Sequence, residues 1–218
     1  MRHDRTVLSK WISSEHGEDK YNEIYFKLPP EQNLPNYIPK KIITVTNNTK
    51  FLGLELDKNI SWKNHVQKII PKLSSAYYLV RRTYPCCNLS TLKMIHFTYF
   101  HTVMEYAISF WGVSVESKRI LQQQKRIIRI MIGSTSRILC RTLFQKLEIL
   151  TLTPQYILSS MRFLSSNLEI FTFNTSVHTI NTRLKLKLHK PTARLTMYQR
   201  SAYSNSINIY NSQMILLN

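Results

Sequence analysis

The sequence predicts a mainly α-helical protein: a helical bundle preceded by a short β-hairpin, with loosely structured segments at both ends. Three observations favour this fold class. Hydrophobic residues make up 43% of the 218 residues, which is enough for a core. Apolar side chains recur every three or four positions through the middle of the chain, as in amphipathic helices. Only four glycines are present, too few for the many tight turns of a β-sandwich or barrel.

Residues 41–57 predict the β-hairpin. Residues 41–46 are rich in β-branched side chains, and residues 51–56 show a second strand pattern. Asn47–Asn48 lies between them, so we expect the turn there. Residues 1–40 are polar in their first half and interrupted by prolines in their second half, which predicts a poorly ordered segment.

Residues 58–173 predict the helical bundle. The first apolar stripe runs over 62–80 and contains Pro71, which should kink or split the helix. The second stripe runs over 92–110, with Ser90 or Thr91 as the expected cap. Its expected buried members are Leu92, Ile95, Tyr99, Val103, Tyr106 and Phe110.

Three further helices complete the predicted bundle. One begins at Glu116 or Ser117 and ends at Gly133, because glycine readily adopts the left-handed conformation that follows a helix. Its apolar face should contain Ile120, Leu121, Gln124, Ile127, Ile128 and Met131. The others are expected at 137–147 and 154–170, with Pro154 in a first helical turn.

The charge of the chain is distributed unevenly. Residues 1–57 hold eight basic and eight acidic groups, whereas residues 58–218 hold 22 Lys and Arg and only four Glu. The net charge of +18 therefore lies in the last three quarters of the sequence. Such a charge attracts polyanions, and nucleic acid is favoured over an acidic protein surface or an anionic membrane.

Residues 174–218 form a basic extension that contains no carboxylate and is rich in Asn, Ser, Thr and Tyr. This composition predicts a loosely structured segment. Tyrosines alternate there with arginine, a mixture that can stack on single-stranded nucleic acid and that also occurs in disordered tails. The residues concerned are Tyr198, Arg200, Tyr203 and Tyr210.

No catalytic or metal-binding set is predicted. Two-metal chemistry needs converging carboxylates, but the sequence contains no Asp-Asp pair and no glycine-rich phosphate loop. The histidines at 65, 96 and 101 are more typical of core or surface positions than of metal ligands. The cysteines form no Cys-x-x-Cys pair, which favours reduced thiols and an intracellular protein, nuclear or cytoplasmic. No membrane-spanning run is visible in the sequence, and we expect no membrane partner.

The helix expected from residue 117 to 132 has a polar side that is a candidate for phosphate binding. At helical spacing its members fall opposite the apolar face. They are Lys118, Gln122, Lys125, Arg126 and Arg129. Contacts from these residues would add affinity but no sequence readout. The alternative, an ordinary solvated helix face, stays open on this evidence.

Several short motifs, in a fixed order, resemble a known family. They are Lys50-Phe51-Leu52-Gly53-Leu54, Leu56-Asp57, Ile60-Ser61-Trp62, His65-Val66, Lys72-Leu73, Tyr77 to Arg81, Glu105 to Ile108, Trp111-Gly112, Ile120 to Arg129, Leu143-Phe144, Leu147 to Leu152, Asn181-Thr182-Arg183 and Ile209-Tyr210-Asn211. Together they cover about residues 41–213. They are similar to the segment after the polymerase active site in reverse transcriptases of non-LTR retrotransposons, especially jockey-like elements. Ala107 replaces the usual glycine, and Ser212-Gln213 replaces the usual Leu-Pro.

The resemblance implies a role for each part. The hairpin, through Lys50, Phe51, Leu52 and Gly53, resembles the primer grip. The helices after it look like the thumb, which would bind RNA or an RNA–DNA duplex. The family's Ala-Asp-Asp turn is absent here. We therefore expect no cofactor in this chain, Mg²⁺ only in the complete polymerase, and no catalysis by this fragment alone.

Two matters stay open in the sequence. A free-standing basic helical nucleic-acid-binding protein derived from a retrotransposon is an alternative to the polymerase fragment. The sequence also does not indicate an oligomeric state. Gly53 is expected within a strand. We predict that a glycine is found there because it allows another backbone or strand to approach closely.

Overall fold

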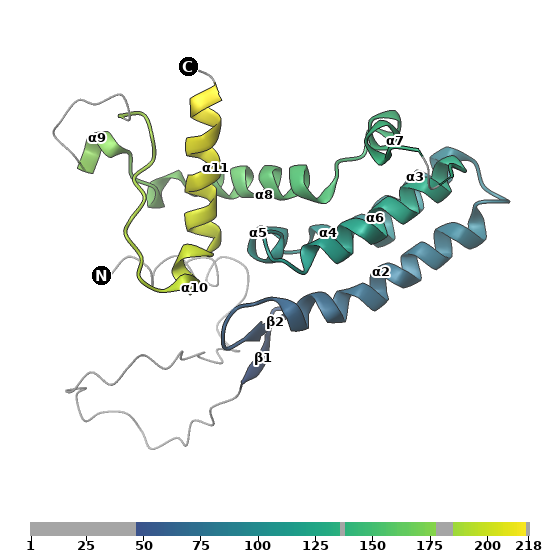
Figure 1. Ribbon diagram of the computed structural model, residues 1–218, viewed down its shortest axis with the longest axis horizontal. Helices are drawn as coiled ribbons and strands as arrows, with labels where there is room; N and C mark the ends of the chain where they lie inside the picture. The colour runs from purple at the N-terminus through teal and green to yellow at the C-terminus, as the bar shows by residue number, and fades with distance from the viewer. Residues whose placement is uncertain (1–46, 136–137, 178–184, 217–218) are drawn as a thin grey trace. The chain divides into compact units, whose positions relative to one another are not determined.

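A computed structural model describes residues 47–135, 138–177 and 185–216 (Figure 1). In these residues the protein is mainly helical, and one antiparallel pair of strands precedes the helices. This agrees with the fold class that the sequence predicts. The strand expected at 41–46 and the segment 1–40 lie outside the described residues.

The hairpin turn lies later in the chain than predicted. Strand β1 (Asn48–Phe51) pairs with β2 (Leu54–Asp57), so the turn is Leu52-Gly53 and the prediction of Asn47–Asn48 is wrong. The φ angles of Leu52 and Gly53 are 44° and 80°. Two positive φ values in a two-residue turn match the twist of the flanking strands, and glycine adopts such a value without steric cost.

Helix α2 (Lys63–Thr83) is continuous, although it contains Pro71. The predicted split is therefore absent. Proline removes the hydrogen bond to the carbonyl of residue 67. Both Gln67 and Pro71 are exposed, so water can reach this side of the helix. The opposite side is buried through His65, Val66, Ile69, Leu73, Ala76 and Val80.

The second predicted helix is divided in the structure. It consists of α3 (Leu89–Ile95), the π-helical turn η1 (His96–His101), α4 (Thr102–Glu105) and α5 (Ile108–Trp111). The cap is also one that the sequence did not predict. Asn88 accepts a hydrogen bond from the backbone N–H of Thr91 at 2.9 Å, so neither Ser90 nor Thr91 is the N-cap.

The π-helical turn changes which side chains face the core. Leu92, His96, Phe100, Met104 and Ile108 are buried. By contrast, Tyr99 and Tyr106, expected in the core, are 55% and 52% exposed. A π-helix bonds residue i to i+5 and so has more residues per turn than an α-helix. Through this turn the buried stripe advances by four residues, from His96 to Phe100, and leaves the predicted stripe after Leu92. Tyr106 is exposed at the break between α4 and α5, where its ψ angle of 116° ends the helix.

The next three helices agree more closely with the predictions from the sequence. Helix α6 (Ser117–Ile132) buries the predicted face and ends at Gly133, whose φ is 68°. Helix α7 (Cys140–Leu147) begins later than residue 137. Helix α8 (Leu152–Ser166) is followed by the 3₁₀ turn η2 (Leu168–Ile170), so the helix expected over 154–170 ends in a tighter turn.

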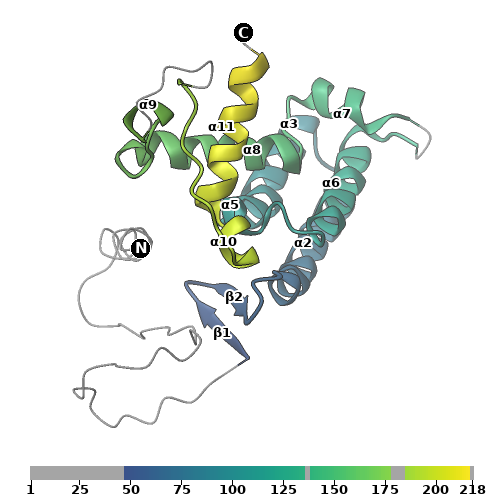
Figure 2. The ribbon, with the colours of Figure 1, turned by 60° about the vertical axis from the view of Figure 1, so that its left-hand side comes forward.

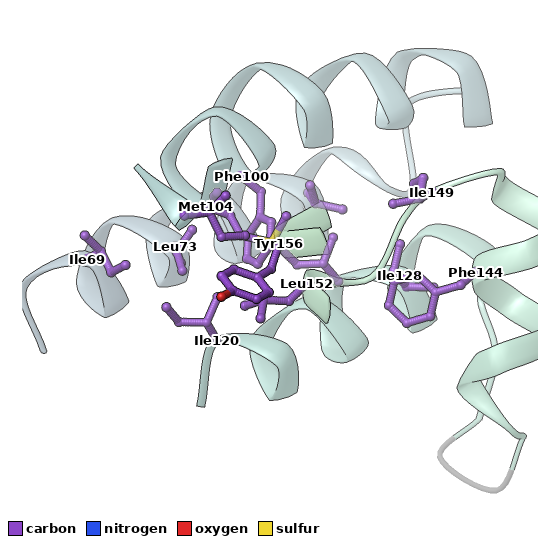
Figure 3. Close-up of a cluster of buried hydrophobic side chains, with 14 of the residues drawn as sticks. Ile69, Leu73, Phe100, Met104, Ile120, Ile128, Phe144, Ile149, Leu152 and Tyr156 are labelled. Carbon is purple, nitrogen blue, oxygen red and sulfur yellow. The ribbon is translucent and has the colours of Figure 1, made fainter. Parts of the chain in front are cut away.

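One contiguous core joins the hairpin to helices α2 to α8. It includes side chains from every helix in that stretch and Leu54 from β2. Figure 3 shows Tyr156 of α8 among Phe100, Met104, Ile120 and Leu152, with Phe144 and Ile149 at the other side of the view. Helix α6 packs along α2 and also contacts α7 and α8. The apolar stripes of the helices are therefore buried against one another.

The C-terminal segment contains more structure than predicted. The short helices α9 (Asn174–Val177) and α10 (Thr196–Gln199) precede the 15-residue helix α11 (Ala202–Leu216). Figure 2 shows α11 crossing α8, and the two helices are in contact. We expected a loosely structured segment here because polar residues dominate its sequence.

A second, smaller core holds this C-terminal segment against α8. It is formed by Leu164, Phe171, Leu188 and Ile207. The ring of Tyr203 stacks on Phe171 at 4.7 Å, and Tyr210 packs against the same core. The Ser206 hydroxyl donates to the Ser160 carbonyl at 3.3 Å. A few apolar residues are thus sufficient to fix a helix that lacks a strong amphipathic pattern.

Candidate nucleic-acid interface

All five candidate residues of α6 lie on one side of that helix. At about 100° per residue, they fall within an arc of about 100°. Lys118, Gln122 and Arg126 are exposed, whereas Lys125 and Arg129 are partly buried. We call this set the α6 basic face. The opposite side of the helix contributes Ile120, Gln124, Ile127, Ile128 and Met131 to the core.

The rotation of α6 is fixed by a buried amide as well as by packing. The side chain of Gln124 is fully buried. Its Nε2 donates to the Leu150 carbonyl at 2.9 Å, and its Oε1 accepts from the Leu152 N–H at 3.0 Å. These bonds satisfy two backbone groups at the start of α8. They also hold the α6 basic face away from the core.

The cations of the α6 basic face have no acidic partners among the described residues. No ion pair within 47–135, 138–177 or 185–216 involves Lys118, Lys125, Arg126 or Arg129. Glu116, at the start of the helix, pairs instead with Arg119 at 3.4 Å. Cations without a partner can bind phosphate without first breaking an ion pair.

The tip of the hairpin is the second candidate surface. Lys50, Leu52 and Gly53 are exposed, and Phe51 is partly buried. The hydroxyl of Tyr106 donates a hydrogen bond to the Leu52 carbonyl and holds the turn. Among the described residues, a Cβ placed on Gly53 would meet only the Tyr106 side chain, at 3.7 Å. Contrary to the prediction, no described backbone approaches Gly53 closely, and its positive φ explains the glycine.

The base of the hairpin is fixed to α2 by polar and apolar contacts. Leu54 is buried in the main core, and Glu55, also buried, forms an ion pair with Lys68. The N–H of Glu55 donates to Nδ1 of His65 at 3.5 Å. Burial is the main reason that the pKa of His65 is lowered, although the nearby Glu55 opposes this effect.

The hairpin tip and the α6 basic face are separate sets of residues, but the elements that carry them both pack on α2. Among the described hydrogen bonds and ion pairs, none joins residues 50–53 to the α6 basic face. Both the hairpin and α6 pack on α2. The sequence did not predict Tyr106 as a contact of the turn, because its spacing suggested a core position and its partner is 54 residues away.

The described residues contain neither a metal-ligand cluster nor a bilayer-spanning helix. No three His, Cys, Asp or Glu side chains in 47–135, 138–177 and 185–216 gather where they could hold a metal ion. In the same residues, no helix has both the length and the apolar character needed to cross a membrane. The Cys86, Cys87 and Cys140 thiols are free.

One known protein is distantly similar to the chain. A protein of Drosophila melanogaster described as "Probable RNA-directed DNA polymerase from transposon X-element" is 25% identical over 152 residues, or 67% of this chain. The chain spans only 17% of the length of that relative. No protein-family model and no solved structure gives a significant match. The similarity supports a relationship to a transposon reverse transcriptase.

Proposed function

We propose that this chain is the primer-grip and thumb-like part of a reverse transcriptase of a non-LTR, jockey-like retrotransposon. In this proposal the α6 basic face binds the phosphate backbone of an RNA–DNA duplex. The supporting observation is a set of cations, without acidic partners in the described part of the chain, on a helix whose other side is fixed in the core. Such contacts give affinity that is independent of sequence, as a duplex-tracking element requires.

The hairpin tip has the second role in this proposal. Lys50, Phe51, Leu52 and Gly53 form a tight turn that would contact the primer strand. The hydrogen bond from Tyr106 to Leu52 and the burial of Leu54 support a rigid tip. A rigid tip positions a bound strand better than a mobile loop does, because less conformational freedom is lost on binding.

Nucleotide transfer is not part of the proposed activity of this chain alone. The described carboxylates are few, and three of them have other partners: Glu55 pairs with Lys68, Glu116 with Arg119, and Glu105 accepts from Gln155 at 2.8 Å. Mg²⁺ and its carboxylate ligands would belong to the rest of the polymerase. Primer extension by the purified chain with Mg²⁺ and nucleotides would contradict this part of the proposal.

Fluorescence anisotropy with a labelled RNA–DNA duplex tests the role of the α6 basic face. The variant Lys118→Gln/Lys125→Gln/Arg126→Gln removes three cations from that face. Each phosphate contact contributes about 0.9 to the slope of log affinity against log salt, so the slope should become shallower by roughly 2 to 3. Affinity for the duplex should fall most at low salt, and the difference from the unmodified chain should shrink as the salt concentration rises.

A variant with the same net charge provides the control. Lys72→Gln/Arg81→Gln/Lys146→Gln removes three exposed cations from α2 and α7. This control variant should change the slope by less than the contribution of one phosphate contact, about 0.9. Equal effects of the two variants would show that total charge, and not the α6 basic face, determines binding. Circular dichroism of both variants must match the unmodified chain.

A free-standing nucleic-acid-binding protein is the second candidate function. The single contiguous core that joins the hairpin to α8 favours it, because such a core can stabilise the chain without a polymerase palm. Flanking nucleotide sequence distinguishes the candidates. An open reading frame that encodes an Ala-Asp-Asp turn upstream supports the polymerase fragment, whereas a separate promoter and a detectable protein of this size support the alternative.

A further inference from the structure

The segment that precedes α11 is strongly basic, and most of its cations are exposed. Residues 174–218 contain no Asp or Glu. Lys185, Lys190, Arg194 and Arg200 are exposed, and Lys187 is partly buried. We call residues 185–200 the basic connection. Residues 174–218 supply no carboxylate to balance this charge, and the basic connection lies in a different part of the chain from α6.

Backbone hydrogen bonds hold the start of the basic connection in place. Phe173 and Leu188 form an antiparallel bridge, in which the His189 N–H donates to the Thr172 carbonyl at 2.7 Å. The Asn211 amide of α11 contacts both backbone groups of Leu188. It accepts from the Leu188 N–H at 2.9 Å and donates to its carbonyl at 3.0 Å. The basic connection is therefore attached to α11 as well as to the segment that follows η2.

A cavity of about 300 Å³ lies between the basic connection and the first turn of α11. Its lining contains the basic Lys190 and the hydroxyl-bearing Thr192 and Ser204, together with Pro191, Ala193 and Gln199. The Gln199 amide, also in the lining, donates to the Ala193 carbonyl at 2.9 Å and so links residues 193 and 199 of the basic connection. The N-terminus of a helix adds partial positive charge at this position. The chemistry of the cavity suits a phosphate group.

One exposed aromatic residue directly precedes Gln199, a lining residue of this cavity, in the sequence. Tyr203 and Tyr210 pack in the second core, but Tyr198 of α10 is 42% exposed. Arginine follows two residues later, at Arg200. A positive groove with an exposed aromatic ring is the usual arrangement for single strands, in which phosphates contact cations and bases stack on rings.

We propose that the basic connection binds single-stranded nucleic acid, with a phosphate in the cavity beside Lys190 and a base on Tyr198. This site goes beyond the duplex contact proposed for α6. It uses other residues, and it requires an unpaired base, which an intact duplex does not offer. The two proposals can therefore succeed or fail independently.

Anisotropy of the full chain with a labelled single-stranded RNA tests the phosphate contacts. Lys190→Gln/Arg194→Gln/Arg200→Gln should make the salt slope shallower by about 2, at about 0.7 per contact, and lower affinity roughly tens of fold at 0.15 M salt. Lys72→Gln/Arg81→Gln/Lys146→Gln is again the control with equal charge. Equal losses for the two variants would overturn the proposal.

Variants at Tyr198 test the stacking. Tyr198→Leu should weaken single-strand binding at least about fivefold, whereas Tyr198→Phe retains the ring and should bind normally. Duplex binding should be unchanged in both variants. An equal loss in Tyr198→Leu and Tyr198→Phe, or no loss in either, contradicts the stacking contact.

A membrane partner is the competing outcome, and vesicles identify it. The chain is incubated with vesicles that contain phosphatidylserine, and bound protein is measured by flotation. If the Lys190→Gln/Arg194→Gln/Arg200→Gln variant loses vesicle binding but keeps its affinity for single-stranded RNA, the basic connection recognises lipid headgroups and the proposal is wrong.

Discussion

The most unusual individual residue is His96 in the π-helical turn. Its side chain is fully buried, and neither ring nitrogen has a hydrogen-bond partner in the described structure. The ring stacks on Phe100 at 5.4 Å and lies 6.3 Å from the ring of His101. Burial, and to a smaller extent His101, lowers the pKa of His96 to about 4. A neutral imidazole thus occupies the position of an apolar core residue.

Protonation of His96 should make stability depend on pH. The unfolded chain takes up a proton near the ordinary histidine pKa of about 6.5, and the folded chain takes it up only near 4. Stability is therefore full above about pH 6.5 and decreases as the pH falls toward 4. The total decrease from this residue is about 3 kcal/mol. Urea unfolding between pH 4 and 7 measures it.

The variant His96→Phe is the control for this prediction. This substitution should remove most of the decrease in unfolding free energy that His96 causes at low pH. At pH 7 it should leave stability unchanged or increase it, because no hydrogen bond of the imidazole is lost. His65, whose pKa is also lowered, remains in both proteins. An unchanged pH dependence in His96→Phe would show that other groups cause the effect.

Gly112 is a residue whose missing side chain is required by packing. A Cβ there would lie 2.6 Å from the Ile108 carbonyl oxygen and 2.7 Å from the Tyr156 ring. We expect Gly112→Ala to destabilise the protein by about 1 to 3 kcal/mol, as overpacking does. Urea unfolding measures the change. Val113→Ala, at the exposed neighbour, should stay within about 0.5 kcal/mol, and equal effects would refute the explanation.

At the scale of elements, helix α2 contains a proline that should lower its stability. Pro71 is exposed, and the Ser75 hydroxyl donates to its carbonyl at 3.1 Å. Pro71→Ala restores a backbone donor within the helix, which favours folding by about 3 kcal/mol. The greater freedom of the unfolded chain offsets about 1 kcal/mol. We therefore expect a net gain of about 2 kcal/mol and a higher melting temperature.

Calorimetry of Pro71→Ala tests this expectation. Lys72→Ala, at the next exposed position, serves as the control and should change stability by less than about 0.5 kcal/mol. A melting temperature of Pro71→Ala at or below that of the unmodified chain would mean that Pro71 contributes to the stability of α2.

The comparison of elements also shows what the sequence could predict. The face of α6 was predictable because an ordinary α-helix keeps its period from Ile120 to Met131. The stripe after Leu92 was not, because nothing in the local sequence distinguishes a π-helical turn. The hairpin was predictable, but its turn was not, since Asn47–Asn48 has stronger turn propensity than Leu52-Gly53.

The α6 basic face could be predicted from the sequence because helix α6 itself could be predicted. The shared side of the α6 residues follows from helical spacing alone. The contact between Tyr106 and Leu52 does not, because it joins positions 54 residues apart. The C-terminal helix α11 was not predicted because its polar residues, such as Ser206 and Asn211, bond to distant backbone groups. Such bonds leave no local pattern.

For the whole molecule, the net charge of +18 should make stability depend on salt. The described part of the chain contains few ion pairs to balance this charge. Repulsion among cations destabilises the compact state and weakens as salt shortens the Debye length to about 10 Å at 0.1 M. The melting temperature should therefore rise between about 0.02 and 0.2 M sodium chloride.

A variant with fewer charges checks the cause of this rise. Lys72→Gln/Arg81→Gln/Lys146→Gln lowers the net charge without removing an ion pair among the described residues. Its melting temperature should increase less with salt than that of the unmodified chain. A melting temperature that falls with salt in both proteins would show that attraction between charges outweighs repulsion.

The π-helical turn has a consequence for how relatives of this chain are to be compared. Such a turn is equivalent to one extra residue inserted into a helix that has no loop to absorb it. A relative with an ordinary helix at His96–His101 would match this chain only if a single-residue gap is opened inside that helix. Without the gap, the positions of α4 from Thr102 to Glu105 would be compared with the wrong neighbours, whereas the break at Tyr106-Ala107 can absorb the difference before α5.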